Sequence, residues 1–297
     1  MSVQLPWVMS VQADAVAADE RDRLARLVEA RAGGRPEWIV LSTCHRVELY
    51  GVGTVPDLDA QFQVEIGQGA VRHLIRVATG LESAIVGENE VLHQVREALK
   101  RACASRPVDP RLQRMFEVAI AGGRRARAGR TTSGGNLAQR AVGWLQERSP
   151  LAGRAVLVAG AGRIGSSLAH SASLAGAVVI IASRDPARAR RLAHLYGGRG
   201  VDLAGGAELA SDSAGVVVAL GGVWREFQPE GDLPPIVDLS APPAIPAAVR
   251  TRLNGGFLGI DDLYTRTQPL PRAYIDQAEQ IVATKTREYL AWFEQRQ

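Results

Sequence analysis

The sequence predicts an α/β protein in which an N-terminal α+β domain precedes a doubly wound parallel sheet, and a long helix follows that sheet. The main observation is the order of patterns in the second half: an apolar run (155–159), a glycine-rich turn (160–165), a helical stretch and a second apolar run (178–182). This order is typical of a parallel β-α-β unit. We therefore expect three segments, residues 1–148, 149–262 and 263–297.

Length and composition indicate two ordinary globular domains. The chain has 297 residues, of which 46% are hydrophobic and 22% charged. No apolar stretch is long enough to cross a bilayer, and the N-terminus lacks the basic and apolar segments of a signal peptide. Two cysteines make no disulfide framework. We therefore expect a cytoplasmic protein with no membrane partner and no metal site.

Arginines crowd one segment, although the net charge is only +4. The cluster consists of Arg111, Arg114, Arg124, Arg125, Arg127, Arg130 and Arg140. Such a cluster favours a polyanionic partner. The alternative is a solvated, arginine-rich helix face.

The first domain mixes helical and strand patterns. A helix is expected over residues 17–32, and apolar strands are expected over 38–41 and 47–52, on either side of Cys44. Further helices are expected over 70–79, 89–105, 110–130 and 137–148. Ser149-Pro150 then marks the domain boundary.

Cys44 ends a predicted strand, beside His45 and Arg46. Nearby positive charge favours the thiolate, which is the nucleophilic form of cysteine. The alternative is an inert buried thiol. Cys44 is therefore the candidate nucleophile of the chain.

The turn Gly160-Ala161-Gly162-Arg163-Ile164-Gly165 matches the G-x-G-x-x-G fingerprint of a dinucleotide-binding (Rossmann) unit. Gly160 permits the tight turn, Gly162 lets the backbone approach a pyrophosphate, and Gly165 lets the helix pack on the strand. Helix amides then face the phosphates. The context of strand, loop, helix and strand favours this interpretation over a structural glycine turn.

The end of the second strand predicts the cofactor. NAD-selective sites place an acidic residue there, whereas this chain has Ser183-Arg184. Arg184 can pair with a 2′-phosphate, and this favours NADPH. Asp185 leaves NADH as the alternative, although Asp185-Pro186 also has the pattern of a helix cap. A nucleophilic thiol combined with a nicotinamide site predicts reduction of an acyl group through a thioester.

Later apolar runs complete the parallel sheet. Strands are expected over 215–220 and 235–239, with a last strand and turn over 259–263. The strand ends at Leu220-Gly221-Gly222 and Ser240-Ala241-Pro242 should line the cofactor crevice. A final helix is expected over 274–297.

Together these motifs resemble the glutamyl-tRNA reductase family. The stretches that carry the resemblance are Leu41 to Tyr50, Ala70 to Ala98, Pro110 to Arg130, the Rossmann unit, Val237 to Ser240 and Ile260 to Leu263. The resemblance implies that Cys44 attacks the ester between glutamate and tRNA, and that NADPH reduces the resulting thioester to glutamate-1-semialdehyde. It also implies tetrapyrrole biosynthesis as the pathway and a downstream aminomutase as a possible partner.

The resemblance also suggests roles for the residues around Cys44. Arg46 matches the arginine that holds the substrate carboxylate, and His73 matches the histidine of acid–base assistance. Ser42 and Thr43 are candidates for substrate hydrogen bonds. Glu88 is a candidate to orient the site, or only a carboxylate at a helix start.

The chain departs from the family pattern in several places. His45 replaces an asparagine of the family's box and His93 a glycine, while the interval from Tyr50 to Ala70 is short. The sequence ends within its last predicted helix, so we expect it to lack the family's C-terminal dimerisation domain, which leaves the oligomeric state open. Two alternatives follow: a specialised relative that reduces another aminoacyl-tRNA or a carrier-bound acyl group, and a non-catalytic NADPH- or haem-binding regulator.

Overall fold

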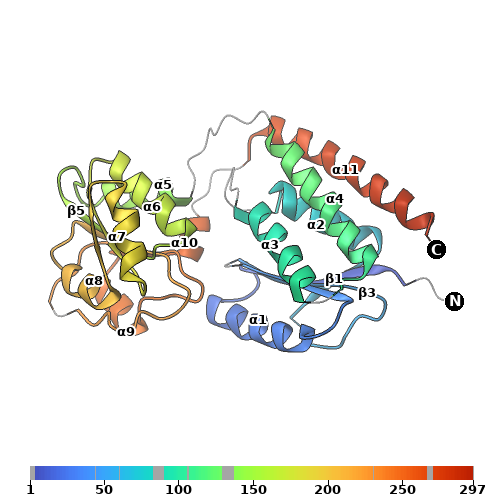
Figure 1. Cartoon of the computed structure of the whole chain (residues 1–297), viewed down its shortest axis with the longest axis horizontal. Coiled ribbons are helices and arrows are strands. Elements are labelled where there is room, and N and C mark those ends of the chain that lie inside the picture. The colour runs from blue at the N-terminus through green and yellow to red at the C-terminus, as the bar shows by residue number, and fades with distance from the viewer. Residues whose placement is uncertain are drawn as a thin grey trace. The chain divides into compact units, whose positions relative to one another are not determined.

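The computed structural model describes residues 4–43, 45–59, 61–82, 90–105, 107–128, 137–229, 231–265 and 270–296. It contains two compact units (Figure 1). The first unit consists of Met1–Gly134 together with Thr267–Gln297, and the second of Gly135–Arg266. The helix expected at 137–148 therefore lies in the second unit, although the expected boundary followed it. No helix in the described ranges is long and apolar enough to cross a membrane.

The first unit is built on a four-stranded antiparallel sheet in the order β2-β3-β1-β4. Its strands are β1 (Pro6–Gln12), β2 (Trp38–Ser42), β3 (Arg46–Val52) and β4 (Gln63–Ile66). The hairpin of β2 and β3 confirms the two strands expected around Cys44. The sequence patterns did not predict β1, which lies inside the sheet, or the edge strand β4.

Helices cover both faces of this sheet (Figure 1). They are α1 (Ala18–Ala32), α2 (Gln68–Thr79), α3 (Glu90–Ser105) and α4 (Pro110–Arg127). Alternate residues of each strand point to opposite faces. Met9 and Leu49 therefore pack with Leu24 of α1, whereas Val8 and Tyr50 pack under α2 and α4.

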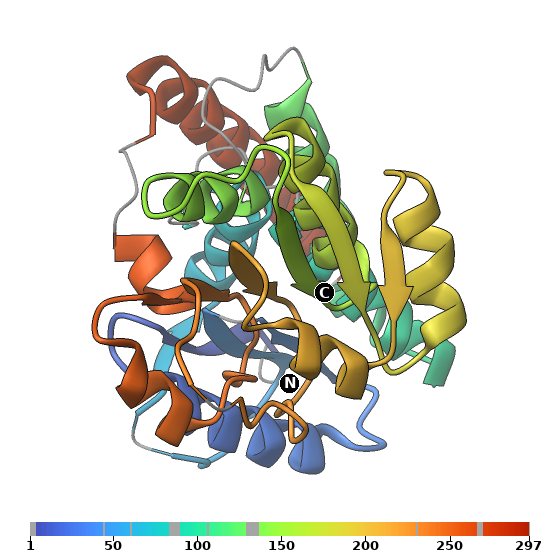
Figure 2. The same cartoon turned by 90° about the vertical axis from the view of Figure 1, so that its left-hand side faces the viewer.

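The second unit is a six-stranded parallel sheet in the order β10-β9-β8-β5-β6-β7 (Figure 2). Its strands are β5 (Ala155–Ala159), β6 (Val178–Ala182), β7 (Arg199–Val201), β8 (Gly215–Val218), β9 (Ile236–Asp238) and β10 (Phe257–Gly259). The strand order reverses between β5 and β8, which is the switch point of a doubly wound fold. The predicted fold class is confirmed.

Helices lie on both faces of the parallel sheet. They are α5 (Leu137–Gln146), α6 (Arg163–Leu174), α7 (Pro186–His194), α8 (Leu203–Leu209), α9 (Ala247–Arg250) and α10 (Ile260–Thr265). The expected strand and turn over 259–263 is wrong in detail, because the strand ends at Gly259 and α10 follows at once. Asp262 accepts a hydrogen bond from the Gly259 amide at 3.0 Å, which stabilises the start of this helix.

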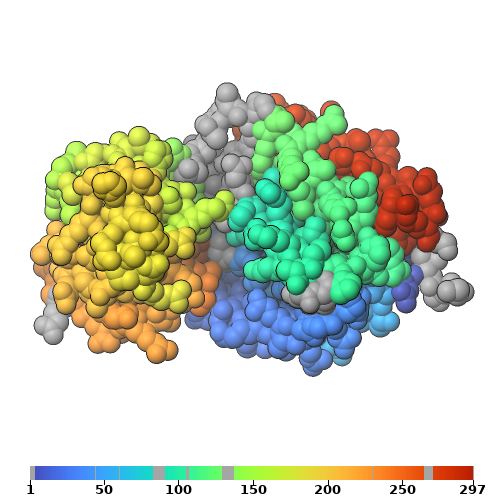
Figure 3. Space-filling model, viewed as in Figure 1, coloured from blue at the N-terminus to red at the C-terminus, as the bar shows by residue number. Residues whose placement is uncertain are grey.

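The last helix, α11 (Arg272–Glu294), packs against α2 and α4 of the first unit (Figures 1 and 3). Its Tyr289 hydroxyl donates to the Arg111 carbonyl at 3.1 Å, and Tyr274 donates to the Thr79 carbonyl. A Cβ on Gly123 of α4 would lie 2.5 Å from the Ala78 carbonyl oxygen of α2, so glycine permits this close helix approach. Residues distant in sequence thus complete the core of the first unit.

Candidate active site

Strand β3 presents three polar side chains to the α2 side of the sheet. Arg46, Glu48 and Tyr50 alternate with the apolar Val47 and Leu49, which pack on the α1 side. Arg46 is 4% exposed, and Glu48 and Tyr50 are fully buried. Because buried charges require partners, this face must contain a closed polar network.

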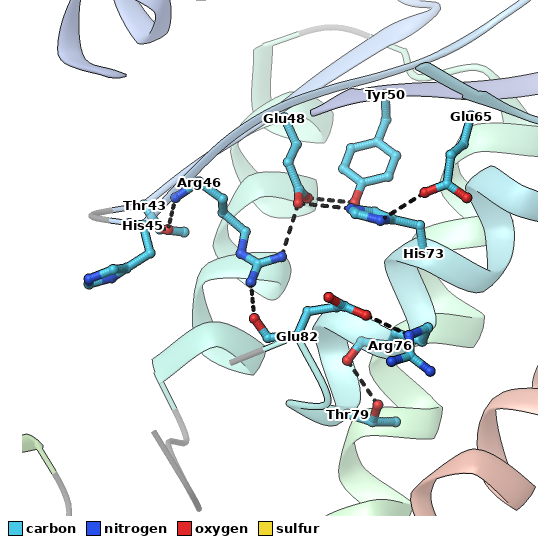
Figure 4. A network of polar contacts seen from close by, with 10 residues as sticks. All are labelled: Thr43, His45, Arg46, Glu48, Tyr50, Glu65, His73, Arg76, Thr79 and Glu82. Atoms are coloured by element: carbon cyan, nitrogen blue, oxygen red, sulfur yellow. Dashed lines mark hydrogen bonds and ion pairs between the residues drawn. The ribbon is translucent and has the colours of Figure 1, made fainter. Parts of the chain in front are cut away.

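Glu48 is the centre of that network (Figure 4). Its carboxylate accepts from Arg46 Nη1 at 3.1 Å, from His73 Nε2 at 2.9 Å and from the Tyr50 hydroxyl at 2.6 Å. The register also places Ser10 of β1 and Leu41 of β2 opposite Glu48. Two cations therefore compensate one carboxylate inside the protein.

His73 is held from two sides. Its Nε2 faces Glu48, and its Nδ1 lies 3.2 Å from Glu65 Oε1 of strand β4. Burial lowers the pKa of His73, but the charge of Glu48 and hydrogen bonds to both carboxylates outweigh burial and raise this pKa to about 9. At neutral pH the ring is therefore an imidazolium.

The pKa of Glu48 shifts in the opposite direction. Burial raises this pKa, but the charges of Arg46 and His73 and the hydrogen bonds of His73 and Tyr50 outweigh burial, and the pKa falls to about 2. Glu48 therefore remains a carboxylate at any pH at which the protein would work.

A second set of contacts links Arg46 to α2 and α11. Arg46 Nη2 donates to the Glu82 carbonyl, and the Glu82 side chain accepts from Arg76 Nε at 2.5 Å (Figure 4). Arg76 also donates to Glu279 of α11. The expected substrate-binding Arg46 is thus already held by two acceptors.

The turn between β2 and β3 contains the other predicted residues. The Thr43 hydroxyl accepts from the His45 and Arg46 amides, each at 3.2 Å, so it shapes the turn. Ser42 pairs with Val47, on the α1 side of the sheet, opposite to the face that carries Arg46. Cys44 and Glu88 lie outside the described residues.

His45 is not a second cation beside Cys44. Burial, followed by the charges of Arg21 and Arg46, lowers the pKa of His45 to about 3. Its neutral imidazole therefore cannot favour the Cys44 thiolate by charge. Of the two basic residues that directly follow Cys44 in the sequence, Arg46 is therefore the one that carries a positive charge.

The glycine loop lies at the switch point of the parallel sheet. Gly160 has φ +121°, and a Cβ there would be 2.3 Å from the Ala219 carbonyl oxygen that follows β8. A Cβ on Gly165 would be 1.9 Å from the Gly160 carbonyl oxygen, whereas one on Gly162 would have no atom within 4 Å. The loop therefore packs tightly on two sides and leaves open space at Gly162.

That open space leaves the backbone at Gly162 accessible to a pyrophosphate. Gly162 is the N-cap of α6 and makes no side-chain cap hydrogen bond. A pyrophosphate needs such a close backbone approach to helix amides. Arg163, which is exposed, and Ile164 follow Gly162 in the first turn of this helix.

After β6, Asp185 is the N-terminal cap of α7. Asp185 caps α7 by accepting from the Arg188 amide at 3.0 Å, and its own amide donates to Ser183 Oγ at 3.2 Å. The predicted cap Asp185-Pro186 is confirmed. Arg184 is exposed at the carboxyl end of β6.

Asp238 organises the neighbouring strand end. Its buried carboxylate accepts from the Ser240, Ala244 and Ile245 amides at 2.9, 2.7 and 2.9 Å. The Ser240 hydroxyl accepts from the Leu220 amide at 2.9 Å, which ties together the two predicted crevice loops. Burial raises the pKa of Asp238, although these amides oppose the shift. This carboxylate therefore shapes the crevice.

Four of the seven clustered arginines make ion pairs or hydrogen bonds within their own unit. Arg111 pairs with Asp109 at 2.6 Å, and Arg114 with Glu288 at 3.1 Å. Arg127 and Arg140 donate to the backbone carbonyls of Ala78 and Leu263, at 2.7 and 3.1 Å. Arg130 lies outside the described residues, and Arg124 and Arg125 are exposed at the end of α4.

Arg125 also lines a pocket of about 250 Å³ between α4 and α11. The other lining residues are Gln277, Gln280, Ile281, Thr284 and Lys285. Lys285 forms an ion pair with Glu288, in which Nζ lies 2.5 Å from Oε2. Each of the two helices therefore contributes one cation to the lining, Arg125 from α4 and Lys285 from α11.

Glu48, Tyr50 and Glu65 were not predicted from the sequence as functional residues. The signal for the first two was present: Arg46, Glu48 and Tyr50 occupy alternate positions of one strand. Such alternation ordinarily predicts a solvated face, and only the helices over this face make it a buried site. Glu65 gave no comparable local signal.

Comparison with known proteins identifies relatives of both parts. Residues 9–129 match the family model described as "Glutamyl-tRNAGlu reductase, N-terminal domain", and residues 155–222 match "NADP oxidoreductase coenzyme F420-dependent". The second unit is accordingly an NAD(P)-binding oxidoreductase domain.

Relatives extend this match over nearly the whole chain. "Glutamyl-tRNA reductase 2" of Nocardioides is 32% identical over 94% of this chain and 70% of that protein. "Glutamyl-tRNA reductase" of Rubrobacter xylanophilus is 33% identical over 92% of this chain and 71% of that protein. The solved glutamyl-tRNA reductase of Methanopyrus kandleri is 27% identical, covers 98% of this chain and 80% of its own, and has a TM-score of 0.47. On the identity and coverage of the two sequence relatives, this chain belongs to the glutamyl-tRNA reductase family.

Proposed function

We propose that this protein is an NADPH-dependent reductase of an aminoacyl ester, with glutamyl-tRNA as substrate and glutamate-1-semialdehyde as product. The observation that carries the proposal is the position of Arg46. This cation follows Cys44 by two positions in the chain, and Glu48 holds it in place. A family member that keeps both the thiol and a positioned cation keeps what thioester formation needs.

Cys44 is the proposed nucleophile. Its thiolate attacks the ester carbonyl, a carbon–sulfur bond forms, and the bond to the ribose oxygen breaks. The departing ribose oxygen takes up a proton. Arg46 favours the thiolate by its charge.

His73 is the proposed acid of this site. A general acid must be protonated before it acts. The contacts of both ring nitrogens with carboxylates, at 2.9 and 3.2 Å, favour that protonated state. This supports the acid–base role implied by the family resemblance.

The glycine loop and the end of β6 are the proposed cofactor site. Gly160, Gly162 and Gly165 would hold the pyrophosphate with the α6 amides, and Ser183 with Arg184 would hold the 2′-phosphate. Bound NADPH supplies the hydride that reduces the acyl group. The capping role of Asp185 supports NADPH over NADH, because its carboxylate is already engaged by the Arg188 amide.

The end of α4 and the adjoining pocket are the proposed contact for the RNA. Arg124 and Arg125 are exposed there, and amide side chains line the pocket. Guanidinium and amide groups hydrogen-bond phosphate oxygens without reading sequence.

A second candidate is a reductase of another aminoacyl ester. Arg46 is 4% exposed and already donates to Glu48 and to the Glu82 carbonyl. A guanidinium engaged in this way has fewer donors left for a substrate carboxylate. This observation favours a donor without a side-chain carboxylate.

The test is aldehyde formation from purified aminoacyl-tRNAs and NADPH. We expect turnover of glutamyl-tRNA by the wild-type protein and by Cys103→Ser, which changes the exposed cysteine of α3, and none by Cys44→Ser. Turnover of a different aminoacyl-tRNA in place of glutamyl-tRNA would establish the second candidate. Equal turnover by Cys44→Ser would contradict both.

A further inference from the structure

Glu65 contacts the buried network from outside the core. It lies on the edge strand β4, and its side chain is 47% exposed, yet its Oε1 is 3.2 Å from Nδ1 of the buried His73. Glu65 falls in the interval between Tyr50 and Ala70, where this chain is short and the sequence suggested no functional residue.

We propose that Glu65 is a positioning residue: from the exposed strand β4 it holds the second ring nitrogen of His73 and keeps the imidazole as a cation against Glu48. The importance of Glu65 for catalysis rests on the proposed function. Its effect on the protonation of His73 is independent of that function.

Two carboxylates around one imidazole favour its protonated form because of the hydrogen-bonding capacity of histidine. A neutral imidazole has one N–H donor and one lone pair, whereas imidazolium has two donors. With both nitrogens facing carboxylates, the neutral ring would turn its lone pair toward Glu48 or Glu65. Loss of the proton is therefore unfavourable in either tautomer.

Charges of alternating sign follow one another through the site: Glu65, His73, Glu48 and Arg46. Among the described residues, two further titratable groups interact with the carboxylates of this series: Tyr50 of β3, whose hydroxyl donates to Glu48, and Arg72 of α2, whose charge favours ionised Glu65. From α4 the side chain packed on Tyr50 is the apolar Phe116. Glu65 is thus the carboxylate that balances His73 on the solvent side.

Removing the Glu65 charge should release the His73 proton. In Glu65→Gln the neutral ring can keep its Nε2–H on Glu48 and place its Nδ1 lone pair toward the amide. The pKa of His73, raised to about 9 in the intact site, should then fall by about one unit or more. Glu48 would lose a cationic partner at mildly alkaline pH and retain Arg46.

The experiment is a ¹⁵N NMR titration of the histidine rings in the full chain. The sequence has five histidines, so the variant His73→Gln identifies the His73 signals by their loss. Glu97→Gln is the matched control, since Glu97 is a 40% exposed carboxylate that lies 3.8 Å from Lys100. A thermal melt of each variant confirms that the fold is kept.

We expect His73 in the wild type and in Glu97→Gln to remain doubly protonated at pH 8, and in Glu65→Gln to titrate at least one unit lower. Glu65→Asp, which keeps the negative charge, should give a His73 pKa between those of Glu65→Gln and the wild type. An unchanged titration in Glu65→Gln, or a neutral His73 in the wild type at pH 7, would overturn the proposal.

A kinetic measurement adds the consequence for catalysis. In Glu65→Gln the alkaline limb of kcat/KM should move to lower pH by the shift found by NMR, with KM little changed. If the His73 pKa falls in the NMR titration while the alkaline limb of kcat/KM stays at the same pH, the positioning role is overturned. A protein that turns over no aminoacyl-tRNA leaves the NMR result valid and contradicts only the proposed function.

Discussion

The Glu48 network and the glycine loop are two candidate sites built in opposite ways. The network consists of polar and charged side chains from β3, β4 and α2, and the charge states of Glu48, Glu65 and His73 depend on one another. The glycine loop consists of backbone, and its defining features are two close approaches and one open space. The first site should therefore respond to changes of charge, and the second to changes of volume.

The largest effect is expected from Glu48→Gln in the network. This change leaves the buried Arg46 without a carboxylate partner and leaves His73 with Glu65 alone, and breaking a buried ion pair costs about 3–5 kcal/mol. Urea denaturation, followed by tryptophan fluorescence, measures this loss. Glu97→Gln is the control and should unfold as the wild type does. A Glu48→Gln protein of wild-type stability would show that the network is not a charge-balanced unit.

The corresponding change in the glycine loop is Gly165→Ala. Its Cβ would meet the Gly160 carbonyl oxygen at 1.9 Å, so strand and helix must separate, at a cost of about 1–3 kcal/mol. NADPH affinity, measured by fluorescence titration, should fall together with the melting temperature.

Gly162→Ala is the matched control for that experiment. Its φ of −82° suits alanine, and the added methyl group meets no protein atom. We expect nearly unchanged stability but about tenfold weaker NADPH binding, because the methyl group enters the space of the pyrophosphate. Equal loss of stability in both variants would contradict the proposed packing.

The pH dependence of stability separates the two sites further. His73 has a pKa raised from 6.5 to about 9 by the fold, so its stabilisation is complete below pH 6.5 and is lost as the pH rises through 9. Over that range the first unit should lose on the order of 2–3 kcal/mol. Denaturation at pH 6, 7.5 and 9 measures this slope, which should flatten in His73→Gln. An equally steep slope in His73→Gln would assign it to another group.

Cofactor selectivity should respond to a smaller change. Arg184→Ala removes the proposed partner of the 2′-phosphate and should weaken NADPH about tenfold while leaving NADH nearly unchanged. Titration of both cofactors measures the ratio. A preference for NADH in the wild type would contradict the role of Arg184.

The two sites also differ in how far the sequence reveals them. The packing roles of Gly160 and Gly165 and the Asp185 cap were predicted correctly because strand, loop and helix are neighbours along the chain. The two strands on either side of Cys44 were predicted for the same reason, although their antiparallel pairing was not.

The Glu48 network required contacts that no local pattern encodes. Glu65 reaches His73 only because β4 pairs with β1, and β1 (Pro6–Gln12) was itself missed, since its side chains do not alternate simply between apolar and polar. Arg46 was singled out for a substrate role, but its bond to Glu48 follows from burial under α2 and α4. The polar face of β3 forms a buried network only because α2 and α4 cover it.

The central claim is that Cys44 forms a thioester with the glutamyl group of its substrate. The most direct test is a single turnover with radiolabelled glutamyl-tRNA in the absence of NADPH, followed by denaturation and counting of protein-bound label. The claim predicts label on the wild type and on Cys103→Ser, none on Cys44→Ser, and release of the label as aldehyde when NADPH is added. Absence of label from all three proteins, or equal label on Cys44→Ser, would contradict it.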